Sequence, residues 1–242
     1  MWRSLQRRSG NIIASGRIPL VVGGTGLYAD SLLKGISFEE RAPADEAYRA
    51  RMTELCAERG SEYIHSLLCK VDQKSAEAIH PNNTKRVIRA LEYHHATGER
   101  ISDYNERTKS IPSPYNAVRI YFTRDRQNLY RRIDMRVDKM LADGLESEVR
   151  ALISAGVDRS TTAMQALGYK EMADFIEGRV TLDEASENIK RLSRNYAKRQ
   201  LTWFRRDEGG IWLNLDEFGS AEECAQRCLE IIGASVAERS KQ

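Results

Sequence analysis

A glycine-rich turn near the start of the chain joins residue types that suit the binding of an anion. One hydroxyl side chain stands among three glycines: Thr25 among Gly23, Gly24 and Gly26. The apolar run from Pro19 to Val22 predicts a short buried strand, and the spacing after Leu27 predicts a helix. Glycines let a ligand approach the backbone, and the amides at a helix start attract negative charge. The turn therefore predicts either a phosphate site or a plain strand-to-helix connection, and three glycines without a lysine favour neither.

A second region is strongly basic and lies between residues 189 and 206. Its seven bases are Lys190, Arg191, Arg194, Lys198, Arg199, Arg205 and Arg206. Since the whole chain carries a net charge of +3, the remainder is acidic by about four charges. Three aromatic residues, Tyr196, Trp203 and Phe204, stand among the bases and offer rings for stacking on unpaired nucleobases. We therefore favour contact with RNA over the alternative, a basic helix that packs on the core through its aromatic side.

A smaller basic group belongs to a helix predicted from about residue 85 to 96, after the turn at Pro81. Lys85, Arg86 and Arg89 share one face of this helix, and its apolar stripe lies on another. For three charges alone, a solvated face is the better interpretation. The aromatic-rich stretch later in the chain makes a second RNA contact here the better hypothesis.

Two arginines on a long predicted helix are also candidates for a site. Arg132 and Arg136 are four residues apart and so share a face of the helix that begins at residue 125. They either pair with neighbouring carboxylates such as Asp134 and Asp138 or point into a site. Their spacing leaves both interpretations open.

The composition is that of a soluble globular protein, with 242 residues of which 41% are hydrophobic and 30% charged. No run of 18 apolar residues occurs, and the first residues lack the apolar core of a signal peptide. The four cysteines have no histidine or further cysteine at zinc-ligand spacing: Cys56, Cys69, Cys224 and Cys228. We expect reduced thiols in a cytoplasmic protein without a membrane segment.

The spacing of apolar residues and the positions of glycine and proline predict the helices and strands that hold these candidate side chains. Residues 2–15 predict a helix that ends at Gly16, residues 109–116 a linker, and residues 117–123 a strand. Gly144 interrupts the long helix, and Thr181 begins the basic helix with a capping box. A short strand at 211–215 and an amphipathic helix complete the chain.

Five ordered motifs carry a resemblance to a known family. They are Val-Val-Gly-Gly-Thr-Gly-Leu-Tyr (21–28), Arg-Ala-Leu-Glu (89–92), Ile-Asp-x-Arg-Val-Asp-x-Met-Leu-x-x-Gly-Leu (133–145), Gln-Ala-Leu-Gly-Tyr-Lys-Glu (165–171) and Ala-Lys-Arg-Gln-Leu-Thr-Trp-Phe-Arg (197–205). In this order they resemble the bacterial tRNA dimethylallyltransferases over essentially the whole chain. The resemblance implies transfer of a dimethylallyl group from dimethylallyl diphosphate to N6 of the adenosine next to the tRNA anticodon.

The resemblance also implies an architecture and a set of site residues. The expected fold is α/β, with a core like that of P-loop nucleoside kinases at 1–41 and 109–242 and a helical insertion at 42–108 that clasps the anticodon stem. Thr25 and Arg136 would reach the diphosphate or the reacting centre, beside the turn glycines Gly23, Gly24 and Gly26. The expected cofactor is Mg²⁺, and the expected state is a cytoplasmic monomer.

The residues that match the family's tRNA-contacting segments fall in four groups. Lys85, Arg86 and Arg89 match the first, and Arg49 matches a further contact, with two extra residues of local spacing. The third and fourth groups are Gln165, Gly168, Tyr169 and Lys170, followed by Lys198, Arg199, Gln200, Thr202, Trp203 and Arg205.

The sequence departs from the family pattern at one point. No Gly-Lys-Ser or Gly-Lys-Thr occurs in the 242 residues, so the P-loop, its Mg²⁺-binding hydroxyl and the aspartate general base that follows it are not matched. We expect a chain that begins within a domain, after the first strand, and that has little or no transferase activity by itself. Two alternatives remain: a non-catalytic tRNA-binding remnant, and an adenylate isopentenyltransferase that acts on a free nucleotide. The complete Lys-Arg-Gln-Leu-Thr-Trp motif favours tRNA over the latter.

Overall fold

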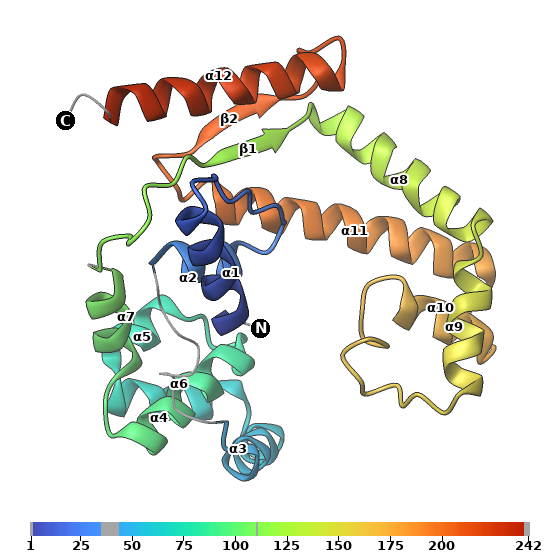
Figure 1. Ribbon diagram of the computed structural model, residues 1–242. Helices are drawn as coiled ribbons and strands as arrows, with labels where there is room; N and C mark the ends of the chain where they lie inside the picture. Colours follow the sequence, from blue (N-terminus) through green and yellow to red (C-terminus); the bar gives the residue numbers. More distant parts are fainter. Residues whose placement is uncertain (1, 35–43, 110, 240–242) are drawn as a thin grey trace. The chain divides into compact units, whose positions relative to one another are not determined.

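The computed structural model describes residues 2–34, 44–109 and 111–239 (Figure 1). The chain divides into two compact units, residues 1–117 and 118–242. Helices dominate both units, and the described residues contain one sheet of two parallel strands, which confirms the predicted α/β class at this coarse level. The division lies just after the stretch expected to be a linker, and the insertion boundaries at 42 and 108 stay a prediction.

In unit 1, two helices flank the glycine-rich turn. α1 spans Trp2–Ala14 and is followed by Gly16, whose φ of 73° ends the helix as predicted. α2 spans Gly26–Lys34. The strand predicted before the turn is wrong, because residues 17–23 form no strand and Val22 is 86% exposed. A strand needs a hydrogen-bonded neighbour, and the part of unit 1 that the structure describes contains no strand to supply one.

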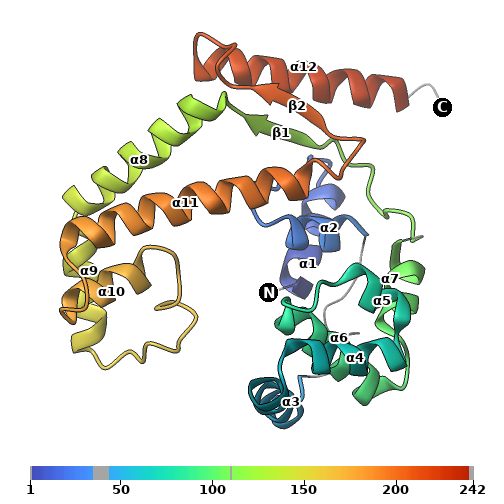
Figure 2. The same cartoon turned by 180° about the vertical axis from the view of Figure 1, so that it is seen from behind.

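Five further helices of unit 1 form a bundle, seen from opposite sides in Figures 1 and 2. They are α3 (Glu46–Arg59), α4 (Ser61–Val71), α5 (Gln73–Ala78), α6 (Thr84–Thr97) and α7 (Ile101–Lys109). Ile64, Leu68 and Val87 are fully buried at its centre. The Asp72 carboxylate accepts from the amides of Ser75 and Ser102, both at 3.0 Å, and so joins the starts of α5 and α7.

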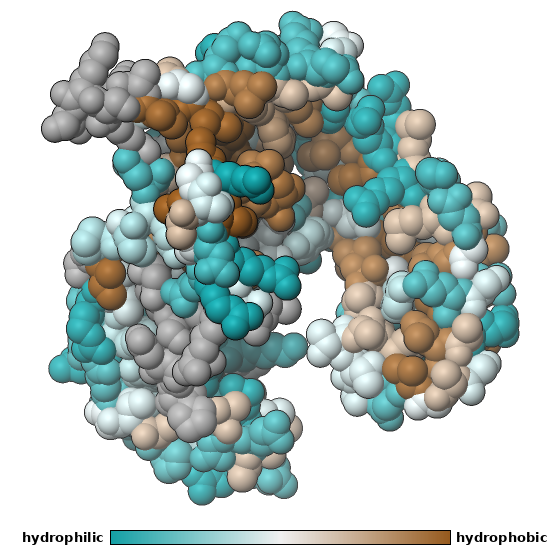
Figure 3. All heavy atoms as spheres, viewed as in Figure 1, coloured by the Kyte–Doolittle hydropathy of each residue, from teal (hydrophilic) through white to brown (hydrophobic). Residues whose placement is uncertain are grey.

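The sheet of unit 2 consists of β1 (Ile120–Thr123) and β2 (Ile211–Asn214) in parallel, with Phe122 opposite Leu213. Both predicted strands are confirmed, although β1 begins three residues later than predicted. α12 (Ala221–Arg239) covers one face of the pair and buries Leu213 and Ile231. Figure 3 shows hydrophilic side chains along the outer side of α12 and hydrophobic ones gathered beneath it.

Between the strands, the chain makes a long helical crossover, as two parallel strands require. Its helices are α8 (Arg126–Ala142), α9 (Leu145–Ser154), α10 (Tyr169–Ile176) and α11 (Leu182–Phe204). Val149, Met172 and Ile189 are fully buried where α8 to α11 pack together. The predicted capping box is confirmed: the Glu184 amide donates to Thr181 Oγ1 at 3.2 Å, and the Thr181 amide donates to Glu184 Oε2 at 2.8 Å.

Membrane-spanning helices and disulfides were both expected to be absent from this chain. No helix among the described residues is both long and apolar enough to cross a membrane. The four cysteines are free thiols, and burial raises the pKa of Cys228.

Candidate functional site

The glycine-rich turn places one hydroxyl at the start of α2. The Thr25 carbonyl accepts from the amides of Tyr28 at 3.0 Å and Ala29 at 3.3 Å, so Thr25 begins the helix. Its side chain is exposed, as is Gly23, where an added Cβ would meet no atom within 4 Å. The predicted helix start is thus in place without the predicted strand. A hydroxyl at a helix start, beside the positive end of its dipole, suits an anionic ligand.

Arg136 lies on α8 in unit 2, and the question left open by its spacing is now answered. Arg132 and Arg136 are both exposed, and neither makes an ion pair with a carboxylate in the described ranges. The neighbouring acids have other partners. Asp134 binds Arg194 of α11 at 2.5 Å, and Asp138 binds Lys190 of α11 at 2.7 Å. Arg136 therefore keeps its five donors available for a phosphate.

These two ion pairs separate the bases of α11 into those paired within the protein and those left for a ligand. Lys190 and Arg194 are half-buried and hold α11 against α8, so their charges are neutralised within the protein. By contrast, Lys198, Arg199 and Arg205 are exposed, and no described carboxylate pairs with any of them. The RNA-binding hypothesis therefore applies to the last two turns of the helix and not to its whole length.

The aromatic residues of this stretch also have different roles. Tyr196 is 42% exposed, and the Arg199 guanidinium lies 5.7 Å from its ring centroid. Phe204 stacks on Tyr121 of β1 with ring centroids 4.9 Å apart, so the expectation that it stacks on a base is corrected. Phe204 packs the end of α11 on the sheet. Trp203 is half-buried and carries Arg206 at 5.6 Å above its ring.

Two polar members of the motif, Gln200 and Thr202, complete the end of α11. Gln200 is half-buried, and the exposed Thr202 hydroxyl donates to the Lys198 carbonyl at 2.9 Å. Such a bond within the helix leaves the Thr202 oxygen able to accept a further hydrogen bond. Their predicted contact with tRNA stays a prediction.

The third predicted group lies in the loop before α10 and at its start. Gln165 Nε2 donates to the Arg159 carbonyl at 2.7 Å, and the Tyr169 hydroxyl donates to Glu148 Oε1 at 2.5 Å. Gly168 has a φ of 101°, which disfavours any side chain there. Lys170 is exposed. The structure thus brings these residues together in unit 2 and leaves Lys170 as the available cation.

Arg159 was not identified from the sequence, although it fixes this loop. Its guanidinium binds Asp174 at 2.8 Å and Glu177 at 2.5 Å, and it donates to the Lys170 carbonyl at 3.3 Å. The partners are up to 18 residues away in the chain. Since they follow no helical spacing from Arg159, no local pattern announces this cluster.

In the bundle of unit 1, two predicted tRNA contacts converge on one carboxylate. Glu92 is fully buried and binds Arg49 at 2.8 Å and Arg89 at 2.7 Å, while the Asp45 amide donates to it at 2.8 Å. Burial acts to raise the pKa of Glu92, but hydrogen bonds from Arg89, Asp45 and Arg49 together lower it. Both arginines therefore have a structural role, and their contact with tRNA stays a prediction.

The other two residues of that basic group are free of this role. Lys85 and Arg86 lie in the first turn of α6, are exposed, and pair with no carboxylate in the described part of the chain. Cations at the positive end of a helix dipole are slightly unfavourable, by roughly 0.3–1 kcal/mol each. The arrangement concentrates positive potential at this helix start.

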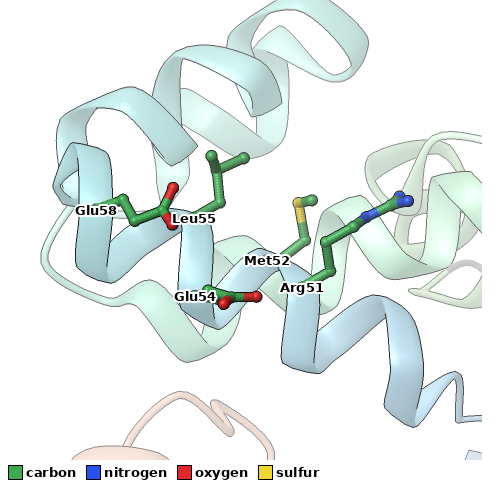
Figure 4. A pocket seen from close by; sticks show the side chains of 5 residues that line it. All are labelled: Arg51, Met52, Glu54, Leu55 and Glu58. Carbon is green, nitrogen blue, oxygen red and sulfur yellow. The ribbon is translucent and has the colours of Figure 1, made fainter.

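Neither a pocket nor a metal cluster offers a competing site. A pocket at α3 is lined by side chains of that helix alone, two of them carboxylates: Arg51, Met52, Glu54, Leu55 and Glu58 (Figure 4). The carboxylates make it unsuited to a diphosphate. The described residues hold no group of three or more His, Cys, Asp or Glu side chains that could bind a metal, and the expected Mg²⁺ stays a prediction.

Comparison with known proteins gives consistent results. A family model described as IPP transferase matches residues 2–207. A tRNA dimethylallyltransferase of Acetivibrio thermocellus is 46% identical over 212 residues, covering 88% of this chain and 67% of the relative. Another, of Geobacillus thermodenitrificans, is 48% identical over 207 residues, covering 86% of this chain and 65% of the relative. The chain thus spans about two thirds of the length of these curated relatives.

A solved structure has a similar fold. The full-length tRNA isopentenylpyrophosphate transferase of Bacillus halodurans matches with a TM-score of 0.67 and 39% sequence identity. The match covers 99% of this chain and 74% of that one.

Proposed function

Because the chain belongs to the IPP transferase family, we propose that it binds the anticodon stem-loop of tRNA and transfers a dimethylallyl group from dimethylallyl diphosphate to N6 of the adenosine beside the anticodon. The observation that carries this proposal is the end of α11. There the motif residues Lys198, Arg199 and Arg205 are exposed cations without a carboxylate partner among the described residues.

Binding of RNA follows from these cations. Each phosphate that a cation neutralises releases counterions, so log K falls by about 0.7–0.9 per contact for each decade of salt. N6 of a stacked adenine is shielded, so the base must leave its stack before it can react. The rings of Tyr196 and Trp203 offer surfaces on which the extruded base can stack. The bundle adds Lys85 and Arg86 as a second group of cations for the stem.

The transfer requires stabilisation of the leaving group. The N6 lone pair forms a bond to C1 of the dimethylallyl group, and the C1–O bond breaks with its electron pair going to the diphosphate. The proton lost from N6 passes to solvent water. Arg136 would bind two diphosphate oxygens through its planar fork. The family resemblance also implies a diphosphate contact for the Thr25 hydroxyl. We also propose that the α/β core resembles that of the P-loop nucleoside kinases.

Two assays on the same preparation test the proposal. The first measures retention of an anticodon stem-loop on the chain over a salt series, and the second measures incorporation of labelled dimethylallyl groups. We expect retention that weakens with salt and little incorporation into tRNA at N6, well below that of a full-length relative. Retention without any incorporation would indicate a binding remnant, and label in free adenylate would indicate the nucleotide-specific enzyme. Lack of retention would overturn the proposal.

A pair of variants of α11 localises the interface. Lys198→Ala and Lys190→Ala remove the same charge from the same helix, but Lys190 is already neutralised by Asp138 and Glu187. We expect Lys198→Ala to raise Kd for the stem-loop about fivefold and to reduce the salt slope by about 0.7–0.9. Equal effects of both variants on the slope would contradict an interface at the end of α11.

A further inference from the structure

The seam between α8 and α11 repeats every four residues on each helix. Three pairs follow one another along it: Asp138 with Lys190, Asp134 with Arg194, and Tyr130 with Lys198. In the first two pairs a carboxylate neutralises the base. In the third, the position on α8 that would hold a carboxylate holds a phenol, which carries no charge to offset the lysine.

The third pair includes another cation. Arg126 lies one turn before Tyr130 on α8, and its Nε donates to the Tyr130 hydroxyl oxygen at 3.2 Å. The Arg126 guanidinium carbon is 5.3 Å and the Lys198 ammonium nitrogen 6.0 Å from the Tyr130 ring centroid. Neither cation has a carboxylate partner within the ranges that the structure describes. The cluster therefore holds two uncompensated positive charges.

The polar groups of this cluster are nearly all donors. The hydroxyl of Tyr130 accepts from Arg126 and keeps its own hydrogen for an outside acceptor. Burial acts to raise the pKa of Tyr130, but the hydrogen bond from Arg126 and the charges of Arg126 and Lys198 outweigh it and lower the pKa. This shift agrees with a positive potential at the hydroxyl.

We propose that Arg126, Tyr130 and Lys198 form a site for one backbone phosphate of the RNA, and that Tyr130 is the residue that keeps this site open by standing where a carboxylate would close it. The inference rests on the proposed function. Arg199 on the same turn of α11 and Tyr196 just before it continue the site toward the next nucleotide.

The site is distinct from the one proposed for the diphosphate. Arg126 and Arg136 are ten residues apart on α8, which places them about 15 Å apart along the helix axis at 1.5 Å per residue. That separation exceeds the span of one diphosphate. A backbone phosphate of a bound RNA is therefore the ligand to which we commit, and the donor diphosphate becomes an outcome of the test.

The test replaces the Tyr130–Lys198 pair by a carboxylate–lysine pair like the other two pairs of the seam. Tyr130→Asp supplies the missing carboxylate, which can pair with Lys198 as Asp134 pairs with Arg194. We expect Kd for an anticodon stem-loop to rise about tenfold and the salt slope to fall by about 0.7–0.9, the loss of one phosphate contact. Thermal unfolding should be unchanged or shifted upward, because a third ion pair joins the helices.

Two further variants separate the site from general effects of charge. Met135→Asp adds the same charge to α8 at a side chain that is 63% exposed and off the seam, and it should leave the slope within about 0.2 of the unmodified chain. Tyr130→Phe keeps the ring and removes the hydroxyl, so we expect about a twofold to threefold loss of affinity.

The outcomes distinguish this inference from the function on which it rests. If the unmodified chain retains no RNA, both fail. If it retains RNA and Tyr130→Asp changes the slope no more than Met135→Asp does, the phosphate site alone is overturned. Weakened binding of inorganic pyrophosphate by Tyr130→Asp with unchanged RNA binding would also overturn it, since the site would then serve the donor.

Discussion

The bundle of unit 1 and the α8–α11 seam of unit 2 both place basic side chains against carboxylates, but with different consequences. In the bundle, Arg49 and Arg89 share the fully buried Glu92, so two cations depend on one acid. Along the seam, Lys190 and Arg194 each have an acid of their own at a half-exposed or exposed position. A charged carboxylate that is fully buried destabilises the fold unless a cation pairs with it. Breaking a partly exposed pair of the seam costs much less folding free energy.

The comparison shows that the number of bases in a segment does not give the number available to a ligand. Of the seven bases predicted to face RNA, Lys190 and Arg194 are neutralised by neighbours on α8. In the bundle, the motif Arg-Ala-Leu-Glu contains both the base Arg89 and the acid that holds it.

Removal of the buried carboxylate should damage the bundle most. Glu92→Ala leaves Arg49, Arg89 and the Asp45 amide without their common acceptor, and we expect a loss of about 3 kcal/mol in bundle stability. Hydrogen exchange of the α6 amides measures this, since all three tryptophans lie outside the bundle. As a control, Glu106→Ala breaks the exposed Lys74–Glu106 pair and should cost less than about 1 kcal/mol. Equal losses would show that burial of Glu92 is unimportant.

Acid should weaken the bundle through its two buried carboxylates. Burial acts to raise the pKa values of Glu92 and Asp72, but hydrogen bonds to both carboxylates outweigh it and lower them. A lowered folded pKa gives stability that is complete above the unfolded pKa, about 4, and is lost as the pH falls through the folded value. Hydrogen exchange of α6 between pH 6 and 3 should show this loss, and Glu92→Gln should flatten it. An unchanged profile in the variant would contradict the assignment.

Opening a seam pair should give the smallest effect, and in the opposite direction. Asp134→Asn removes the charge that neutralises Arg194, one turn from Lys198 on α11. We expect affinity for the stem-loop to rise about threefold and the salt slope to steepen by up to about 0.7–0.9. Asp143→Asn, which opens the exposed pair with Lys139 at the far end of α8, is the control and should change neither. If Asp134→Asn instead bound the stem-loop more weakly, Asp134 would serve to orient Arg194 and not to neutralise its charge.

Local sequence was sufficient for the features that depend on near neighbours. The helix ends at Gly16 and Gly144, the capping box of Thr181 and the long helix from residue 126 all follow from backbone preference and contacts within one turn. The motifs were sufficient for the family. The apolar run at 19–22 shows the limit, because an extended segment becomes a strand only beside a hydrogen-bonded partner, and composition does not supply one.

Pairing across elements needed the fold. Whether Arg136 was free depended on Asp134 and Asp138, and these acids are taken by bases that lie more than 50 residues later in the chain. The sequence placed the cations of α11 on a helix, but the packing of α8 against it assigned a carboxylate to two of them and a phenol to the third. Electrostatic availability is decided by contacts of a few ångströms between distant segments, and those contacts exist once the helices have packed.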